Sequence, residues 1–331
     1  MSIPETARAL WFVGPRVVEI REEKLRALGA GEVLVSGLAS GVSQGTELLL
    51  YRGEGPAVFD ASLGAGASAD TGTTYPRRYG YAWVGEVIAK GAEVRLPVGA
   101  RVFSLATHGD AHVLDGAAVR ALPEDFPATR AVLAANLETA ITCVWDAQVG
   151  LGDDAVVLGG GVVGILTAWL LARSGASVTL VEPSAKRREA ARALVPSAMI
   201  VAEEPSDGCA DVVIEATGNP KALDLAVAWA RPEGRIVVAS FYGSRRWPID
   251  LGDAFHRRRL ELRASQVSSI PPRLRERWSP NRRWLLVMSL LAERALDALL
   301  APAVAFDRAG ELYASLDTDV DVPPAHVFVY R

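Results

Sequence analysis

The hydrophobic pattern divides the chain into two kinds of segment. Between residues 7 and 120, short apolar runs alternate with turns rich in glycine and proline; Ala9–Val13 and Val17–Ile20, for example, flank Gly14-Pro15 as in a hairpin. Many short strands of this kind predict a compact, β-barrel-like domain. From residue 154 onward, apolar strands alternate with helical segments, which predicts a doubly wound parallel sheet and an α/β fold class.

The stretch Asp154–Glu182 carries the most specific motif. A short apolar run leads into Gly159-x-Gly161-x-x-Gly164, followed by an apolar helical segment and a second strand that ends at Glu182. Gly159 permits a tight turn, Gly161 lets backbone N–H groups approach a pyrophosphate, and Gly164 lets helix and strand pack closely. The motif therefore predicts a dinucleotide site.

The cofactor prediction depends on the charges after the second strand. Glu182 follows Gly159 by 23 residues, where an acid accepts hydrogen bonds from the ribose hydroxyls of adenosine. This favours NAD, because a carboxylate repels a 2′-phosphate. Lys186, Arg187 and Arg188 leave NADP possible, or they form a solvated helix start.

The remaining pattern predicts the other elements and the domain boundaries. The expected helices are Ala128–Asp146, Lys186–Leu194, Lys221–Ala230 and Arg283–Leu300, and the expected later strands are Asp211–Ala216, Arg235–Ser240, Leu260–Arg263 and His326–Tyr330. Since the tail has the short-strand character of the first domain, we expect it to return there. The predicted domains are 1–134, completed by 299–331, and 135–298.

Composition narrows the possible classes of protein. A chain of 331 residues with 50% hydrophobic and 22% charged residues is typical of a folded protein, and the net charge of −4 gives no reason to expect nucleic-acid binding. Two cysteines, Cys143 and Cys209, do not make a disulfide framework or a Cys-rich zinc lobe. We expect no signal peptide, no membrane span and a cytoplasmic location.

Two regions permit more than one interpretation. Gly53–Thr74 is rich in small and polar residues and is either a surface loop or a flap beside an active site. The arginines between Arg245 and Arg283 form a solvated face or a subunit contact, or a subset of them recognises an acidic substrate.

A β-rich domain, a Rossmann domain and a returning tail together resemble the medium-chain dehydrogenase/reductase superfamily over nearly the whole chain. The resemblance implies a GroES-like first domain. It aligns Ser43, Tyr81, Ala82 and Ala135 with the positions where zinc-dependent members carry metal-site residues. Hydroxyls are poor zinc ligands beside thiolate and imidazole, so the resemblance implies no catalytic zinc.

The zinc-lacking branch that includes hydroxyethyl-bacteriochlorophyllide dehydrogenase is the most similar part of the superfamily. The similarity lies in SGVSQGTELLLYRGE, which begins at Ser40, and in Ser240–Gly243. It implies hydride transfer between a nicotinamide cofactor and a small-molecule substrate.

The resemblance also implies candidate catalytic residues. Without zinc, hydrogen-bond donors must stabilise a developing alkoxide, and Tyr81, Thr46 and Ser43 lie near the former metal position. Tyr81 is alternatively a packed aromatic between the two domains. Glu47 is expected to hold the loop after Ser43 through backbone N–H groups.

Two residues of the helix that leads into the second domain are further candidates. Glu138 is either a general acid or base with a raised pKa, or a capped or salt-bridged helix carboxylate. Asn136 either fixes a substrate carbonyl or caps backbone.

Carried over residue by residue, the family pattern implies a set of cofactor contacts and a dimer. The pyrophosphate would lie on Gly159, Gly161, Val162, Val163 and Gly164, the ribose on Glu182, and the remaining contacts on Thr139, Thr217, Gly218, Phe241 and Tyr242. Ser265–Val267 would lie at the edge through which a homodimer forms.

Three functions are consistent with these residues. The first is a zinc-independent NAD(P)-dependent oxidoreductase that interconverts an alcohol and a ketone on a specialised metabolite. The second is an NADPH-dependent reductase of an activated C=C bond, of the enoyl or quinone type. The third is a cofactor-binding sensor or scaffold without turnover.

Overall fold

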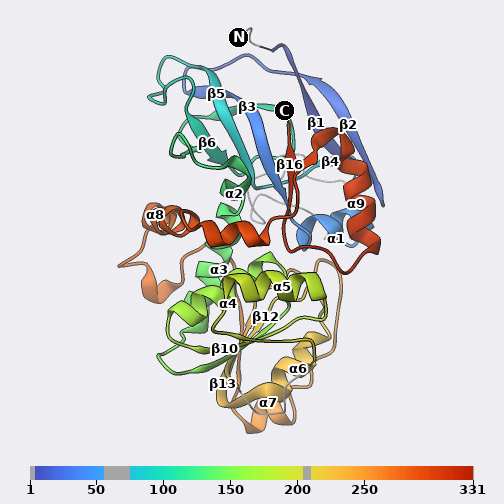
Figure 1. Ribbon diagram of the computed structural model, residues 1–331, viewed down its shortest axis with the longest axis vertical. Coiled ribbons are helices and arrows are strands. Elements are labelled where there is room, and N and C mark those ends of the chain that lie inside the picture. Colours follow the sequence, from blue (N-terminus) through green and yellow to red (C-terminus); the bar gives the residue numbers. More distant parts are fainter. Residues whose placement is uncertain (1–3, 56–74, 204–209, 331) are drawn as a thin grey trace. The chain divides into compact units, whose positions relative to one another are not determined.

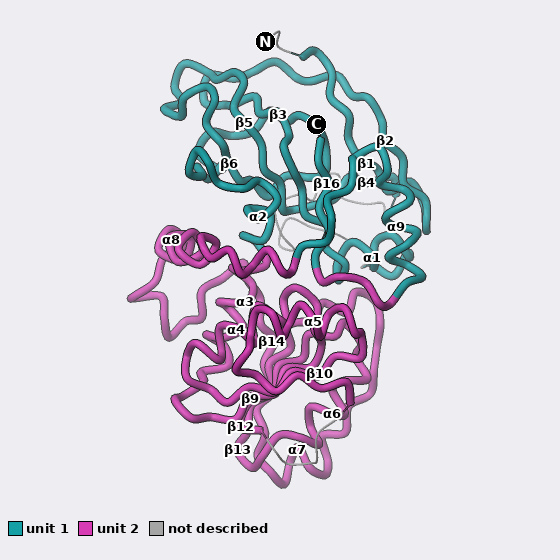
Figure 2. The backbone as a smooth tube through the Cα atoms, viewed as in Figure 1, with its two compact units in different colours: residues 1–135, 300–319, 325–331 teal, residues 136–299, 320–324 magenta. Residues whose placement is uncertain are grey.

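The computed structural model describes residues 4–55, 75–203 and 210–330, which form two compact units (Figure 2). Unit 1 comprises residues 1–135, 300–319 and 325–331, and unit 2 comprises residues 136–299 and 320–324. The main difference from the predicted boundaries is 320–324, a short piece of the tail that belongs to unit 2. Cys209 and most of Gly53–Thr74 lie outside the described residues.

Among the described residues of unit 1, the strands form two sheets (Figure 1). A three-stranded sheet has the order β2-β1-β4, and a seven-stranded sheet has the order β15-β16-β3-β5-β6-β8 with β7 also paired to β3. The bounds are β1 Thr6–Gly14, β2 Val17–Lys24, β3 Glu32–Val42, β4 Arg77–Arg78, β5 Trp83–Lys90, β6 Arg101–Ser104, β7 Ala111–Asp115, β8 Arg120–Ala121, β15 Val304–Ala305 and β16 His326–Val329. The hairpin predicted at Gly14-Pro15 joins β1 to β2, and the tail strand β16 pairs with β3.

The helices of unit 1 include one that the pattern analysis missed. The bounds are α1 Thr46–Arg52, α2 Ala128–Ala131, η4 Phe306–Arg308 and α9 Ala309–Thr318. In α9 the buried residues Ala309, Leu312, Tyr313 and Leu316 recur at helical spacing. The expectation of only short strands in the returning tail was therefore wrong, although the apolar period was visible in the sequence.

Among the described residues of unit 2, six parallel strands form one sheet in the order β11-β10-β9-β12-β13-β14. The bounds are β9 Asp154–Leu158, β10 Ser177–Val181, β11 Met199–Val201, β12 Ala210–Glu215, β13 Ala230–Val238 and β14 Glu261–Ala264. Leu158 is in register with Val181 and Glu215, and Glu215 is in register with Val238. The predicted doubly wound parallel sheet is confirmed, and its strands end along one edge.

The helices of unit 2 correct two predicted boundaries. The bounds are α3 Ala134–Ala147, α4 Val162–Arg173, α5 Ala185–Leu194, α6 Ala222–Trp229, α7 Ala254–Arg257, η2 Pro272–Leu274, α8 Pro280–Leu291 and η3 Arg294–Leu299. The single helix predicted over Arg283–Leu300 is wrong, because Ser279 caps α8 ahead of Pro280 and a 3₁₀-type bond from Glu293 N–H to the Leu290 carbonyl follows its end. The helix predicted over Ala128–Asp146 is likewise two helices, α2 and α3.

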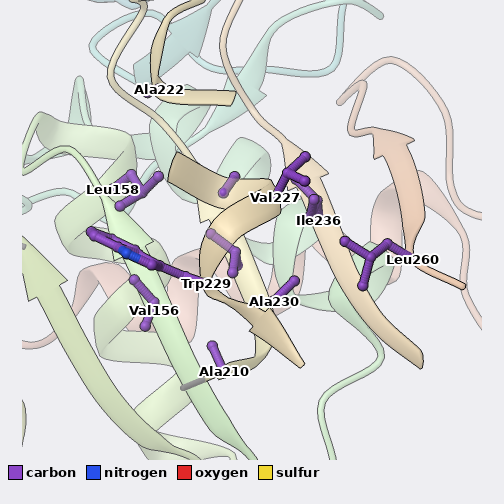
Figure 3. Close-up of a cluster of buried hydrophobic side chains, with 11 residues drawn as sticks. Val156, Leu158, Ala210, Ala222, Val227, Trp229, Ala230, Ile236 and Leu260 are labelled. Carbon is purple, nitrogen blue, oxygen red and sulfur yellow. The ribbon is translucent and has the colours of Figure 1, made fainter. Parts of the chain in front are cut away.

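An apolar cluster fixes α6 against the sheet of unit 2. Figure 3 shows the Trp229 indole lying beside Val156 and Leu158 of β9, with Ile236 of β13 in the same cluster. Trp229 is 2% exposed, and full burial of a large aromatic ring is among the strongest contributions to a core. The cluster includes residues of β9, β12 and β13, the strands whose carboxyl ends carry candidate cofactor residues.

Two further expectations concern membranes and cysteine chemistry. In the described part of the chain, no helix has both the length and the apolar character needed to cross a membrane.

Cys143 is buried in α3, and burial raises the pKa of its thiol to about 11. Its thiol therefore stays protonated near neutral pH, as expected of a core cysteine.

Replacing Trp229 with alanine is expected to lower the free energy of unfolding by about 3–5 kcal/mol, because it removes a large ring from a closed core. Leu151→Ala is the control, since Leu151 is 90% exposed. Urea unfolding followed by circular dichroism measures both. A loss for Trp229→Ala no larger than that of the control would contradict the packing described here.

Candidate functional site

The turn between β9 and α4 requires glycine at two positions. Gly159 has φ +98°, and a Cβ there would lie 2.7 Å from the Ala216 carbonyl oxygen. A Cβ at Gly164 would lie 1.9 Å from the Gly159 carbonyl oxygen. The close approach of helix, turn and neighbouring strand is therefore possible only without side chains at Gly159 and Gly164.

Gly161 differs from these two glycines because the space beside it is open. It is the N-cap residue of α4, its side of the helix carries no side-chain cap, and a Cβ there would meet nothing within 4 Å. Val162 and Val163 follow in the first turn, where backbone N–H groups lack intrahelical partners. Open space above N–H donors at the positive end of a helix dipole fits a pyrophosphate.

Glu182 lies directly against this turn. It is 4% exposed, and its Oε2 accepts a hydrogen bond from Gly160 N–H at 2.7 Å while Oε1 accepts one from Ser184 N–H at 2.8 Å. A Cβ at Gly160 would lie 2.7 Å from Glu182 Cγ. The motif analysis did not assign Gly160 a role, although it is the middle glycine of three in succession.

A buried carboxylate organises the residues at the end of β12. Glu215 Oε1 accepts hydrogen bonds from Thr217 N–H at 2.8 Å and from Thr217 Oγ1 at 2.5 Å, and Oε2 accepts one from the Tyr242 hydroxyl at 2.5 Å. Burial and the neighbouring Glu215 carboxylate raise the pKa of Tyr242. Gly218 N–H donates to Ser240 Oγ at 2.8 Å. Two predicted cofactor residues, Thr217 and Tyr242, therefore bind Glu215. The sequence analysis did not assign Glu215 a role, although this residue ends an apolar strand.

Phe241, Thr139 and Asn136 are the remaining predicted site residues of unit 2. Phe241 is 37% exposed beside Tyr242. Thr139 and Asn136 are half-buried in α3. The nicotinamide and substrate contacts expected of these three residues stay predictions.

In unit 1, the predicted hydroxyl groups lie together. The Tyr81 hydroxyl donates to Ser43 Oγ at 2.5 Å, and Thr46 N–H donates to the same oxygen at 3.4 Å. Burial raises the pKa of Tyr81 to about 12, against the effect of its hydrogen bonds with Ser43 and Thr46. The phenol is therefore a protonated hydrogen-bond donor at neutral pH.

A buried carboxylate–imidazole pair supports this loop. Glu47 Oε1 accepts from Ser43 N–H at 3.0 Å, which confirms the expectation that Glu47 holds the loop after Ser43 through backbone. Its Oε2 lies 3.1 Å from His108 Nε2 and also accepts from the Tyr313 hydroxyl. His108 Nδ1 is 2.7 Å from Ser40 Oγ. The sequence analysis did not predict this role of His108, because Glu47 and His108 are 61 residues apart in the chain.

Glu138 forms a salt bridge with a buried arginine. Its Oε1 lies 3.2 Å from Arg283 Nε, and Arg283 is only 7% exposed. The same guanidinium donates to Thr142 Oγ1 at 3.2 Å and to the Val267 carbonyl at 2.8 Å. Glu138 lies in the second turn of α3, which begins at Ala134. These contacts favour a salt-bridged structural carboxylate over a free acid or base, and they make Arg283 a structural arginine.

The positions aligned with zinc ligands carry side chains poorly suited to zinc. Ser43 and Tyr81 bind each other, and Ala82 and Ala135 are buried apolar residues. Within residues 4–55, 75–203 and 210–330, no group of three or more His, Cys, Asp or Glu side chains could hold a metal ion. His112 Nε2 donates a hydrogen bond to the Thr107 carbonyl at 2.9 Å, and burial lowers the pKa of this imidazole to about 4. At the aligned positions, Ser43 and Tyr81 offer only hydroxyl oxygens, which are poor zinc ligands beside thiolate and imidazole.

A family model described as zinc-binding dehydrogenase matches residues 162–285. This range covers most of unit 2. It contains none of the positions aligned with zinc ligands, which are 43, 81, 82 and 135. The match includes Gly164, Glu182 and the strands from β10 to β14, and it begins after β9, Gly159 and Gly161.

Curated relatives and solved structures are similar over most of the chain. D-guloside 3-dehydrogenase of Escherichia coli is 28% identical, over 92% of this chain and 95% of the relative. The 2-desacetyl-2-hydroxyethyl bacteriochlorophyllide A dehydrogenase of Cereibacter sphaeroides is 29% identical, over 71% of this chain and 74% of the relative. The structure of acetophenone reductase from Geotrichum candidum in complex with NAD superposes with a TM-score of 0.81 at 16% identity, over 100% of this chain and 99% of that one.

These similarities agree with the architecture derived from the residues. The solved structure shares the fold over its whole length, which confirms the predicted Rossmann sheet with a separate β-rich, GroES-like domain. The glycine turn, the acid after the second strand and the returning tail strand all have the positions that this architecture requires. In sequence and in fold, the chain is similar to members of the medium-chain dehydrogenase/reductase superfamily.

Proposed function

We propose that the protein is a NAD-dependent, zinc-independent oxidoreductase that interconverts an alcohol and a ketone. The observation that carries the proposal is the Tyr81–Ser43 hydroxyl pair at the positions aligned with zinc ligands. In the proposed reaction, unit 2 binds the dinucleotide and unit 1 supplies hydrogen-bond donors for the substrate oxygen.

The residues of unit 2 fit a nicotinamide dinucleotide. Backbone N–H groups of Val162 and Val163 would hold its pyrophosphate beside Gly161, and Glu182 would accept hydrogen bonds from its ribose. The bound nicotinamide would supply a hydride donor or acceptor. The buried Glu182 carboxylate supports NAD over NADP, because it would repel a 2′-phosphate.

Unit 1 would stabilise the negative charge that develops on the substrate oxygen. Since the pKa of Tyr81 is raised to about 12, its hydroxyl remains a donor throughout the neutral range. It would donate to the substrate oxygen as negative charge develops there, and Ser43 would hydrogen-bond to the Tyr81 oxygen. Glu47 would keep Ser43 and Thr46 in place through the loop that it holds.

An alcohol is the substrate class that the relatives support. Their names specify dehydrogenation at position 3 of a guloside and dehydrogenation of a hydroxyethyl bacteriochlorophyllide. We extend only the hydroxyl-bearing substrate to this chain. The narrower prediction of a specialised metabolite rests on the resemblance to the bacteriochlorophyllide enzyme.

We also propose a homodimer formed through β14. This strand pairs with β13 on one side, and all of its residues are exposed, with Leu262 at 41%. It is a terminal strand of the sheet order among the described residues, and an unpaired strand edge is a template for another chain. A second copy of the same strand would cover it.

Gly161→Asp is expected to abolish dinucleotide binding without unfolding the chain. The open space accommodates a side chain there, and aspartate is a favoured N-cap residue. Its carboxylate would lie close to the pyrophosphate, and about 4 kcal/mol of repulsion between two unit charges about 4 Å apart weakens binding by roughly 1,000-fold. Fluorescence titration with NADH measures the dissociation constant, with Gly161→Ala as the uncharged control. Equal NADH affinity in the aspartate variant and the control would refute the site.

Tyr81→Phe is expected to lower kcat for ketone reduction by about 100-fold or more, since it removes a donor to the developing alkoxide. Tyr79→Phe is the matched control, because Tyr79 is a buried neighbour whose ring centroid lies 6.2 Å away. With a pKa of about 12 for Tyr81, the wild-type rate should show no loss from this phenol up to about pH 10.

The assay uses NADH with a panel of ketones and their matching enones, and thermal unfolding checks that both variants are folded. A kcat for Tyr81→Phe equal to that of Tyr79→Phe would contradict the proposed role. Turnover of enones alone would favour the C=C reductase, and NADH binding without turnover of any kind would favour the sensor or scaffold.

A further inference from the structure

A short piece of the tail contributes a carboxylate to unit 2. Residues 320–324 belong to this unit, although the tail on both sides of them belongs to unit 1. Asp321 Oδ1 accepts a hydrogen bond from the Ser184 hydroxyl at 2.6 Å and from Lys186 N–H at 3.1 Å. These donors open α5, so Asp321 lies against the start of that helix.

Asp321 is connected through one serine to Glu182, the acid that is proposed to bind ribose. Ser184 donates its backbone N–H to Glu182 at 2.8 Å and its hydroxyl to Asp321 at 2.6 Å. A single serine therefore connects both carboxylates. The hydrogen bonds from Ser184 and Lys186 N–H lower the pKa of Asp321, so it is ionised at neutral pH.

The basic residues of α5 are directed mainly to protein oxygens. Arg187 Nε donates to the Val322 carbonyl at 3.3 Å, and Arg187 Nη1 lies 3.8 Å from Glu182 Oε2. Arg188 Nη1 donates to the carbonyls of Glu182 and Pro183 at 2.9 and 2.6 Å. Arg187 and Arg188, the two arginines for which the sequence left NADP binding possible, therefore bind the backbone of the tail at Val322 and of the turn at Glu182 and Pro183.

A 2′-phosphate would need the donors that Asp321 already uses. In a Rossmann unit the adenosine ribose lies at the end of the second strand, beside the start of the next helix. A phosphate on that ribose is bound by hydroxyl and N–H donors and by cations. Here the Ser184 hydroxyl and Lys186 N–H both point to a carboxylate.

We propose that Asp321 is a specificity-determining residue that excludes NADP by holding its carboxylate where a 2′-phosphate would bind. The inference rests on the proposed dinucleotide site and adds a second carboxylate, from the tail, to the discrimination by Glu182. Asp321 repels the phosphate and occupies its donors, whereas the ribose hydroxyls of NAD do not require them.

Two variants of the full chain separate charge from occupancy. Asp321→Asn keeps an acceptor oxygen for Ser184 and Lys186 but removes the charge, and Asp321→Ala also frees the donors. Glu189→Gln is the control, since it also removes one negative charge, from an exposed position on α5, the helix whose start Asp321 contacts. Fluorescence titrations with NADH and with NADPH give dissociation constants for all four proteins, and thermal unfolding verifies their folding.

The expected result is an NADPH dissociation constant about tenfold lower in Asp321→Asn and lower still in Asp321→Ala, with NADH binding changed less than about twofold. Glu189→Gln should change neither ligand. Unchanged discrimination in both Asp321 variants would overturn the inference while leaving the proposed function intact. Failure of the wild-type protein to bind NADH would overturn the proposed function and this inference with it.

Discussion

The candidate cofactor site of unit 2 depends on one constraint, the close approach of the backbone of α4, of the turn after β9 and of the end of β12. Gly159 and Gly164 permit contacts that any side chain would prevent, and Gly160 admits the buried Glu182 carboxylate. Glu182 in turn receives the N–H of Ser184, whose hydroxyl binds Asp321 of the tail. One short turn therefore links the start of α4, the acid of the second strand and residue 321 of the tail, and it leaves the space beside Gly161 open.

Buried carboxylates with full sets of hydrogen-bond donors organise both units. Glu47 receives donors from Ser43, His108 and Tyr313 in unit 1, and Glu215 receives donors from Thr217 and Tyr242 in unit 2. An unsatisfied buried carboxylate would be costly, so each of them strongly favours one geometry of its partners. In unit 1 this carboxylate, Glu47, also holds the backbone of Ser43, which carries one of the candidate catalytic hydroxyls.

Local pattern predicted the parts of the fold that depend on near neighbours in sequence. The strand–glycine–helix motif, the hairpin at Gly14-Pro15 and the parallel sheet were all visible as spacing or periodicity. The helix α9 was also visible as a period but was overlooked. The roles of Glu215, His108 and Asp321 depend on partners brought close only by the tertiary fold, such as Tyr313 with Glu47 and Ser184 with Asp321. Spacing carries no information about such pairs, whereas Tyr81 and Ser43 were placed together by family resemblance.

Deuteride transfer by metal-free protein tests the central claim most directly. The protein is stripped of metal, its metal content is measured by mass spectrometry, and it is mixed with C4-deuterated NADH and a panel of ketones. The account predicts deuterium on the carbinol carbon of the product at a rate that added zinc does not raise. Deuterium transfer that begins only when zinc is restored would contradict it.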